Sequence, residues 1–263
     1  LGLPMAELLR LFQHSLPLGA LDTSTLSSSG VLTLADTPAG IASRNTLHNR
    51  IVADAFVPAG GRPATMNESN WKDFLLPDGT PSAKVIVEGA NLFLTPEARL
   101  ALFEHTALPI VKDSSANKCG VICSSMEIRA SMCVTDDEFV ALKGQYVSEV
   151  LDRLRHMAQL EARLLFAEAA RDADTPLPAL SERISFAILR VSDALATLLD
   201  AHSRSHELWP VVSAQLPPAL ANSEHAAKLE ESLPWEYQKS TIAKSLASRL
   251  VYREGLVYVE SMP

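Results

Sequence analysis

Residues 84–127 read KVIVEGANLFLTPEARLALFEHTALPIVKDSSANKCGVICSSME and decide the predicted fold. A short β-branched run ends at the small residues Gly89, Ala90 and Asn91, which let a backbone pass close to a neighbour. Thr95 and Pro96 are typical of a helix start, and a second apolar run then ends in the polar stretch 113–117. This strand–helix–strand order predicts a βαβ unit with parallel strands. Loops beyond the carboxyl ends of such strands face the crevice where ligands bind.

The residues upstream extend the same pattern. Residues 51–57 are apolar apart from one aspartate, which predicts a strand buried on both faces of a parallel sheet. The expected order is strand 51–57, helix 67–76, strand 84–88, helix 96–106 and strand 108–112. Alternation of this kind implies right-handed crossovers. The fold class is therefore α/β, as part of a Rossmann-like doubly wound parallel sheet, followed by an all-helical region.

The helical region begins near residue 129. Thr135 with Glu138 forms a capping-box pattern that predicts a helix over 136–171. Its apolar stripe is more typical of core packing than of a coiled coil. A second helix carries Ile184, Ile188, Val191, Leu195 and Leu198 on one face, a third spans 237–251, and an amphipathic helix covers 4–14 before loops or a hairpin over 15–50. We expect two domains, 1–128 and 129–263.

Composition excludes several classes of protein. The net charge of -8 over 263 residues argues against nucleic acid as a partner, because nucleic-acid binders usually present a basic surface. No apolar run is long enough to cross a bilayer, so we expect no membrane partner. Three crowded cysteines, Cys119, Cys123 and Cys133, predict reduced thiols and an intracellular protein. The chain begins at Leu1 in what resembles a helix start, so we expect a longer polypeptide.

Three loops, 58–61, 89–91 and 114–120, each combine small residues with an amide, a hydroxyl or open backbone. They are either a site for a flat polar ligand or simple connectors. Phosphate-loop and nucleophile-elbow motifs are missing from the sequence. Cys119, Cys123, His202 and His206 have little in common as metal ligands, so we predict no metal.

Two carboxylates stand at predicted strand ends, Glu88 and Asp113. Buried carboxylates there could serve acid–base chemistry. We favour instead a structural role, either capping or pairing with Lys84 or Lys112.

The segments VEGANLFLTPEA (87–98), DSSANKCGVICSSME (113–127) and ADAFVPAGGRP (53–63) resemble the glutamate dehydrogenase family, above all its large NAD-dependent members with long subunits. The resemblance implies NAD as the cofactor. It implies that Asn91 and Asn117 contact the nicotinamide and ribose side, with Gly89 and Ala90 in the same turn. It also implies that Ala59 and Gly60 line that pocket, and that Ser124 holds the carboxylate of glutamate.

The same resemblance implies that the parent protein oxidises L-glutamate to 2-oxoglutarate and ammonia. The family's catalytic lysine and aspartate and its glycine-rich phosphate turn belong upstream, so we expect no catalytic residue in this chain and no activity of the fragment alone. We expect a homo-oligomer in the mitochondrion or the cytoplasm. The alternatives are a dehydrogenase of another amino acid, such as leucine or phenylalanine, and a non-catalytic oligomerisation scaffold with the same fold.

Overall fold

The fold is described from a computed structural model of the chain. It describes residues 10, 13–14, 26–27, 30–31, 37–49, 51–221 and 223–262. Most of the predicted helix over 4–14 lies outside them. The chain divides into two compact units, residues 1–54 with 72–83, and residues 55–71 with 84–263.

The first unit contains an antiparallel pair of short strands, β1 (Leu26–Ser27) and β2 (Gly30–Val31), which confirms the expected hairpin. The helix α2 (Pro38–Asn45) and the 3-10 turn η2 (Leu47–Asn49) follow, in a region for which loops, a short strand or a hairpin were expected and no helix. The Ser82 hydroxyl donates to the carbonyl of His48 at 2.9 Å, and the His48 ring faces the buried Phe74 ring. These contacts join residues 72–83 to the rest of the unit.

The second unit holds a parallel pair, β3 (Ile86–Val87) and β4 (Ile110–Val111), connected by α3 (Pro96–Thr106). This arrangement confirms the predicted βαβ unit, with strands shorter than expected. Residue Phe56 extends the sheet by a parallel bridge to Ile86, through hydrogen bonds from Phe56 N to Val85 O and from Val87 N to Phe56 O. Three chain segments therefore run parallel in the predicted order.

Two predictions for the chain upstream of β3 are wrong: the strand over 51–57 and the helix over 67–76. Residues 51–57 make only isolated bridges, and Val52 is 70% exposed instead of buried on both faces. Within the described residues, this segment is paired only through single bridges, from Ala53 to Ala83 and from Phe56 to Ile86 of β3. The predicted helix 67–76 is reduced to the 3-10 turn η3 (Trp71–Phe74). Its start is occupied by Asn67 and Asn70 side chains that bond nearby backbone groups, which competes with a regular helix.

The structure confirms the helix starts that local capping predicts. Thr95 accepts a hydrogen bond from Ala98 N at the start of α3. Thr135 and Glu138 form the complete capping box of α6 (Asp136–Arg171). Both helices begin and end at the predicted residues, because a cap is specified by side chains within one turn.

Beyond β4 the chain is helical, in keeping with the predicted change from an α/β part to helices. A one-turn helix, α4 (Asp113–Ala116), leads through Asn117 and Lys118 into the longer helices. These are α5 (Cys119–Cys133), α6, α7 (Leu177–Asp200), the turn η4 (His206–Leu208), α8 (Trp209–Ser213), α9 (Ser223–Ser232) and α10 (Trp235–Glu260). The predicted boundary at 128 falls within α5 and stays a prediction.

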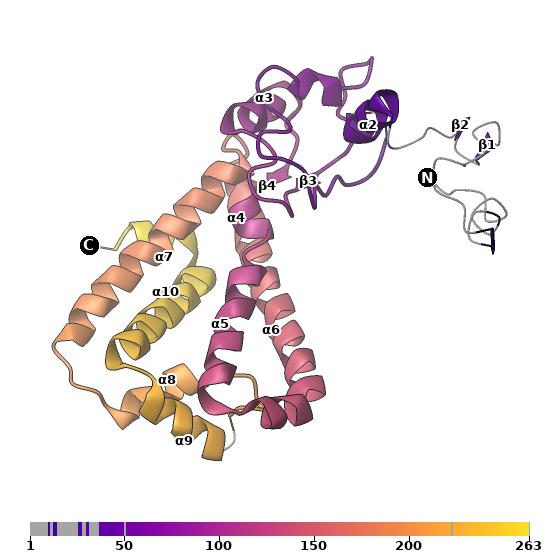
Figure 1. Cartoon of the computed structure of the whole chain (residues 1–263). Helices are drawn as coiled ribbons and strands as arrows, with labels where there is room; N and C mark the ends of the chain where they lie inside the picture. Colours follow the sequence, from indigo (N-terminus) through magenta and orange to yellow (C-terminus); the bar gives the residue numbers. More distant parts are fainter. Residues whose placement is uncertain are drawn as a thin grey trace. The chain divides into compact units, whose positions relative to one another are not determined.

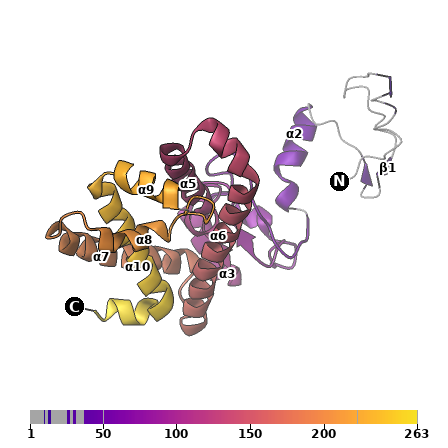
Figure 2. The ribbon, with the colours of Figure 1, turned by 90° about the horizontal axis from the view of Figure 1, so that it is seen from below.

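The helices pack around two apolar clusters. One lies among α5, α6, α8, α9 and the start of α10, and includes Tyr146 and Val150. The other joins α6, α7 and the end of α10, and includes Leu164 and Ile184. Figures 1 and 2 show α10 running along α7. The stripe on α6 is therefore core, as predicted, whereas Leu198 on α7 was wrongly placed and is 65% exposed.

The helix α10 is longer than predicted and contains a kink. Gly255 has φ 81° and ψ 175°, which is outside the helical region. Its position would bring an added Cβ to 3.0 Å from a Glu168 carboxylate oxygen. The chain turns there and returns Leu256 and Val259 to the core. None of the described helices is both long and apolar enough to cross a bilayer.

Candidate functional site

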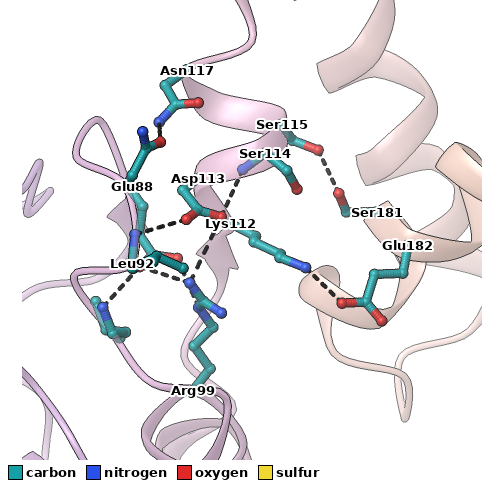
Figure 3. A network of polar contacts seen from close by, with 12 residues as sticks. Glu88, Leu92, Arg99, Lys112, Asp113, Ser114, Ser115, Asn117, Ser181 and Glu182 are labelled. Atoms are coloured by element: carbon teal, nitrogen blue, oxygen red, sulfur yellow. Dashed lines mark hydrogen bonds and ion pairs between the residues drawn. The ribbon is translucent and has the colours of Figure 1, made fainter. Parts of the chain in front are cut away.

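The three loops singled out in the sequence meet beside β3 and β4. The Ala90 amide donates to the carbonyl of Pro58 at 2.6 Å. The Asn117 side-chain amide donates to the side-chain oxygen of Asn91 at 2.5 Å and to the carbonyl of Gly89 at 3.3 Å. Figure 3 labels Asn117, whose side-chain amide makes the contact with Asn91. Loops from three separate parts of the sequence thus form one polar surface.

Glycine at position 89 permits this close approach. A Cβ there would lie 3.3 Å from the carbonyl oxygen of Pro58 and 3.7 Å from the Cα of Ala59. Gly60 differs, because a Cβ there would meet nothing within 4 Å. Glycine at position 89 therefore allows the 58–61 and 89–91 loops to touch, whereas the space beside the Cα of Gly60 is unfilled. Ala59, Gly60 and Asn91 are exposed, while Ala90 and Asn117 are half-buried.

A network of buried ion pairs and hydrogen bonds supports the chain on both sides of the 89–91 loop. Glu88 is fully buried and accepts two hydrogen bonds from the Arg99 guanidinium, at 2.8 and 3.1 Å, and one from Leu94 N. Asp113 lies 3.8 Å from the same guanidinium and accepts from Leu92 N at 2.8 Å. That amide belongs to a residue with φ 58°, a conformation that a leucine adopts only when its surroundings hold it.

The identity of the cation in this network corrects the sequence analysis, which suggested Lys84 or Lys112. The partner of Glu88 is Arg99, on α3, and Lys112 pairs with Glu182 on α7 (Figure 3). A guanidinium suits the position because its planar fork can serve a carboxylate bidentately. The structural role that we favoured for both carboxylates agrees with these contacts.

A third buried carboxylate, Glu161, lies beside the Asn117 loop. Glu161, on α6, is 4% exposed and accepts hydrogen bonds from Ser115 at 2.7 Å, Lys118 at 2.5 Å and Tyr252 at 2.5 Å. Burial by itself raises the pKa of Glu161, but the Lys118 charge and the three donors outweigh it and hold that pKa below its usual value. Burial and the Glu161 charge together raise the pKa of Tyr252 far above its ordinary range. The carboxylate is therefore ionised and the tyrosine neutral at physiological pH.

Sequence reasoning missed Glu161, yet a signal was present. Val150, Leu154, Met157 and Leu164 define the apolar stripe of α6, and position 161 falls in the same helical register. A charged residue in an apolar stripe indicates a buried partner. The partner Tyr252 could not be identified in this way, since it lies 91 residues away.

Ser124 lies further along α5, about two turns from Asn117. Its side chain is exposed and donates to the carbonyl of Gly120 on the same helix at 3.2 Å. Among the contacts of the described residues, it has no hydrogen bond to the asparagine pair. The structure therefore brings Asn91, Asn117, Gly89 and Ala90 together with the Ala59 loop, and leaves Ser124 on its own exposed helix face.

The chemistry available at this surface is recognition of neutral polar groups. Side-chain amides offer both donors and acceptors, and the loop backbone adds more. In the described part of the chain no three histidine, cysteine or acidic side chains gather as they would around a metal ion. The three cysteines are free thiols. The surface can orient a planar ligand, and the charged side chain of the 114–120 loop, Lys118, is engaged in its ion pair with Glu161.

Comparison with known proteins places this surface in a family context. A family model described as Glutamate/Leucine/Phenylalanine/Valine dehydrogenase matches residues 11–174. The chain is 33% identical to the "Probable NAD-specific glutamate dehydrogenase" of Schizosaccharomyces pombe, over 96% of the chain and 25% of that protein. It is 33% identical to the "NAD-specific glutamate dehydrogenase" of Saccharomyces cerevisiae, over 97% of the chain and 26% of that protein.

A third relative is "Glutamate dehydrogenase 2" of Dictyostelium discoideum, which is 34% identical over 82% of the chain and 22% of its own length. The chain thus spans about a quarter of the length of the curated relatives it matches. No solved structure matches the chain with significance.

Proposed function

The chain belongs to the glutamate/leucine/phenylalanine/valine dehydrogenase family, and we propose that it forms the nicotinamide-side wall of an NAD-dependent glutamate dehydrogenase. The relatives named NAD-specific glutamate dehydrogenase support the choice of NAD and glutamate. The observation that carries the proposal is the meeting of Asn91 and Asn117 on an exposed loop surface at the sheet edge. An edge of this kind is where α/β folds bind their ligands.

The residues present fit the nicotinamide end of NAD. The amides of Asn91 and Asn117 would hold the carboxamide and ribose, and the Gly89–Ala90 turn and the Ala59–Gly60 loop would line the pocket. The open side of Gly60 leaves room for a group that the protein itself does not fill. When bound, NAD accepts the α-hydrogen of glutamate as hydride, which leads to 2-oxoglutarate and ammonia after hydrolysis.

Ser124 would donate a hydrogen bond to the substrate carboxylate. Its hydroxyl is exposed and now bonds only a carbonyl of its own helix, so it can turn to a ligand without breaking a tertiary contact. A neutral donor beside two neutral amides orients both reactants and leaves proton transfer to residues elsewhere in the longer protein. The fragment would then be inactive by itself.

The wider proposal follows the family. Residues 1–128 would complete part of a doubly wound parallel sheet together with upstream strands, and residues 129–263 would form a helical domain. We further propose that the whole protein is a homo-oligomeric intracellular enzyme, mitochondrial or cytoplasmic. The two parallel strands and the bridging Phe56 segment support the sheet.

The test uses the full-length protein. Asn117→Ala is expected to raise the KM for NAD, and Ser124→Ala the KM for glutamate, each by about tenfold, because a lost hydrogen bond to a charged or tightly held group is worth about 1.5 kcal/mol. Ser131→Ala is the matched control, since Ser131 is an exposed serine on the same helix that also bonds its own backbone.

Unchanged Michaelis constants in the two site variants would contradict the site assignment. A panel of amino acids separates glutamate from leucine and phenylalanine as substrates. A wild-type protein that reduces NAD with none of them would contradict the enzymatic function and favour the scaffold.

A further inference from the structure

The segment around Asn117 is held by three helices of the carboxyl-terminal region. Ser115 and Lys118, which flank Asn117, both donate to the Glu161 carboxylate of α6. The Ser115 hydroxyl also lies 2.6 Å from that of Ser181 on α7, a contact visible in Figure 3. The segment that carries Asn117, a candidate cofactor-binding residue, is thus bonded to α6 and α7, which lie far along the sequence.

The third helix, α10, reaches the same carboxylate. The Tyr252 hydroxyl donates to Glu161 and lies 3.2 Å from the Lys118 ammonium, which also sits 5.9 Å from the centre of the Tyr252 ring. Three hydrogen-bond donors, one of which is the positively charged Lys118 ammonium, therefore converge on one buried carboxylate. Such an arrangement has few alternative geometries, because moving any member leaves a buried polar group unsatisfied.

The position of these bonds along the chain gives them a specific effect. Asn117 lies between the two residues that Glu161 holds, and its backbone N–H bonds the carbonyl of Asp113. With residues 113, 115 and 118 all fixed, the backbone of residue 117 has little freedom. That restraint fixes the point from which the side chain starts, and hydrogen bonds to Asn91 and to the carbonyl of Gly89 then direct its amide.

We propose that Glu161 is a positioning residue for the cofactor: acting through Ser115 and Lys118, it fixes the Asn117 amide, so that the helical region sets the affinity of the enzyme for NAD. This inference rests on the proposed function. Glu161 does not contact the ligand and takes no part in the chemistry. Its role is to hold a neighbouring loop in the geometry that binding requires.

Glu168 supplies a matched control on the same helix. It is 5% exposed, compared with 4% for Glu161, and it also accepts hydrogen bonds, from Leu256 N and Arg171. It lies seven residues further along α6 and contacts the end of α10 instead of the Asn117 segment. A variant at this position disturbs a buried carboxylate of the same helical region without touching the loop.

The experiment compares Glu161→Gln, Tyr252→Phe and Glu168→Gln in the full-length enzyme. Steady-state kinetics give KM for NAD and kcat, and fluorescence titration gives the Kd of NADH without turnover. Glu161→Gln is expected to raise both KM and Kd about tenfold with a smaller change in kcat, since a displaced Asn117 amide would lose its hydrogen bond to the cofactor, which corresponds to about a factor of ten in affinity. Tyr252→Phe, which removes only one hydroxyl, is expected to shift both in the same direction by less.

Glu168→Gln is expected to lower the thermal unfolding midpoint and leave both constants unchanged. Equal effects of Glu161→Gln and Glu168→Gln on the Kd of NADH would overturn the inference in favour of general packing. A wild-type enzyme that is active with NAD and glutamate, together with unchanged constants in the Glu161 and Tyr252 variants, would overturn this inference alone. Wild-type protein without NAD-linked activity would overturn the proposed function as well.

Discussion

Replacing Arg99 by methionine tests the network beneath the loops. The substitution keeps much of the side-chain length and removes the charge that Glu88 and Asp113 share. Glu88 is fully buried and would lose two charge-assisted hydrogen bonds, at 2.8 and 3.1 Å. At about 1.5–3 kcal/mol each, these amount to roughly 3–6 kcal/mol. Removing one partner of a buried ion pair costs about 3–5 kcal/mol, which agrees.

Amide hydrogen exchange measures this local loss of stability at individual backbone N–H groups. The Leu94 amide donates to Glu88 and the Leu92 amide to Asp113. A local loss of about 3 kcal/mol corresponds to exchange roughly two orders of magnitude faster, because 1.36 kcal/mol is a factor of about ten. We expect this acceleration at both amides in Arg99→Met, with a smaller change in the distant helices.

The exposed pair of Arg183 and Glu260 provides the control. Their side chains are 42% and 43% exposed, and an exposed pair contributes about 1 kcal/mol or less. Arg183→Met is therefore expected to change exchange little. If Arg99→Met changes the exchange of the two leucine amides no more than Arg183→Met does, the reasoning about the buried pair is refuted.

Three other predictions concern the helical region. Gly255→Ala is expected to destabilise the protein by about 1–3 kcal/mol, because its backbone conformation is nearly restricted to glycine and the new methyl would lie 3.0 Å from Glu168; a lower thermal unfolding midpoint is the measurement. Leu180→Ala, at a fully buried position, is expected to cost about 2–5 kcal/mol in urea unfolding, whereas the exposed Leu198→Ala is expected to change stability by about 0.5 kcal/mol or less. The pKa of Glu161 is lowered on folding, so the stability that its ionised carboxylate contributes is present above the unfolded pKa of about 4.3 and is lost as the pH falls through the folded pKa. Acid titration followed by circular dichroism is expected to show a smaller acid-induced loss of stability in Glu161→Gln than in the wild type. An equal loss in both proteins would contradict the assignment.

Local signals made parts of the fold predictable. The helices α3 and α6 begin at the expected residues because Thr95 and Thr135 cap them within one turn. The sheet was less predictable, since pairing depends on residues far apart in the sequence. Residues 51–57 have the composition of a buried strand, but composition does not show which neighbours are there to cover them. The side chains of Ile51, Val52 and Val57 are exposed in the described chain.

The candidate site was likewise predictable only where local sequence determines its geometry. Parallel strands bring their carboxyl ends to one edge, so the meeting of Asn91 and Asn117 follows from the predicted βαβ order. The choice of Arg99 as the buried cation, and of Tyr252 as the partner of Glu161, depends on how helices pack. Such packing is set by the complementary shapes of whole side-chain surfaces, which no short stretch of sequence specifies.

The length of the helix α5 affects how precisely its first residues can be positioned. It begins two residues after Asn117, carries Ser124 on its first turns and ends at Cys133 inside an apolar cluster. Its 15 residues make a rod roughly 22 Å long at about 1.5 Å per residue. A tilt of about 5° at the anchored end would displace the other end by about 2 Å, more than the roughly 0.5 Å within which a binding group must be held. The apolar cluster at one end and the Glu161 network beside the other therefore both oppose such a tilt, and together they fix the direction of the helix that carries Ser124.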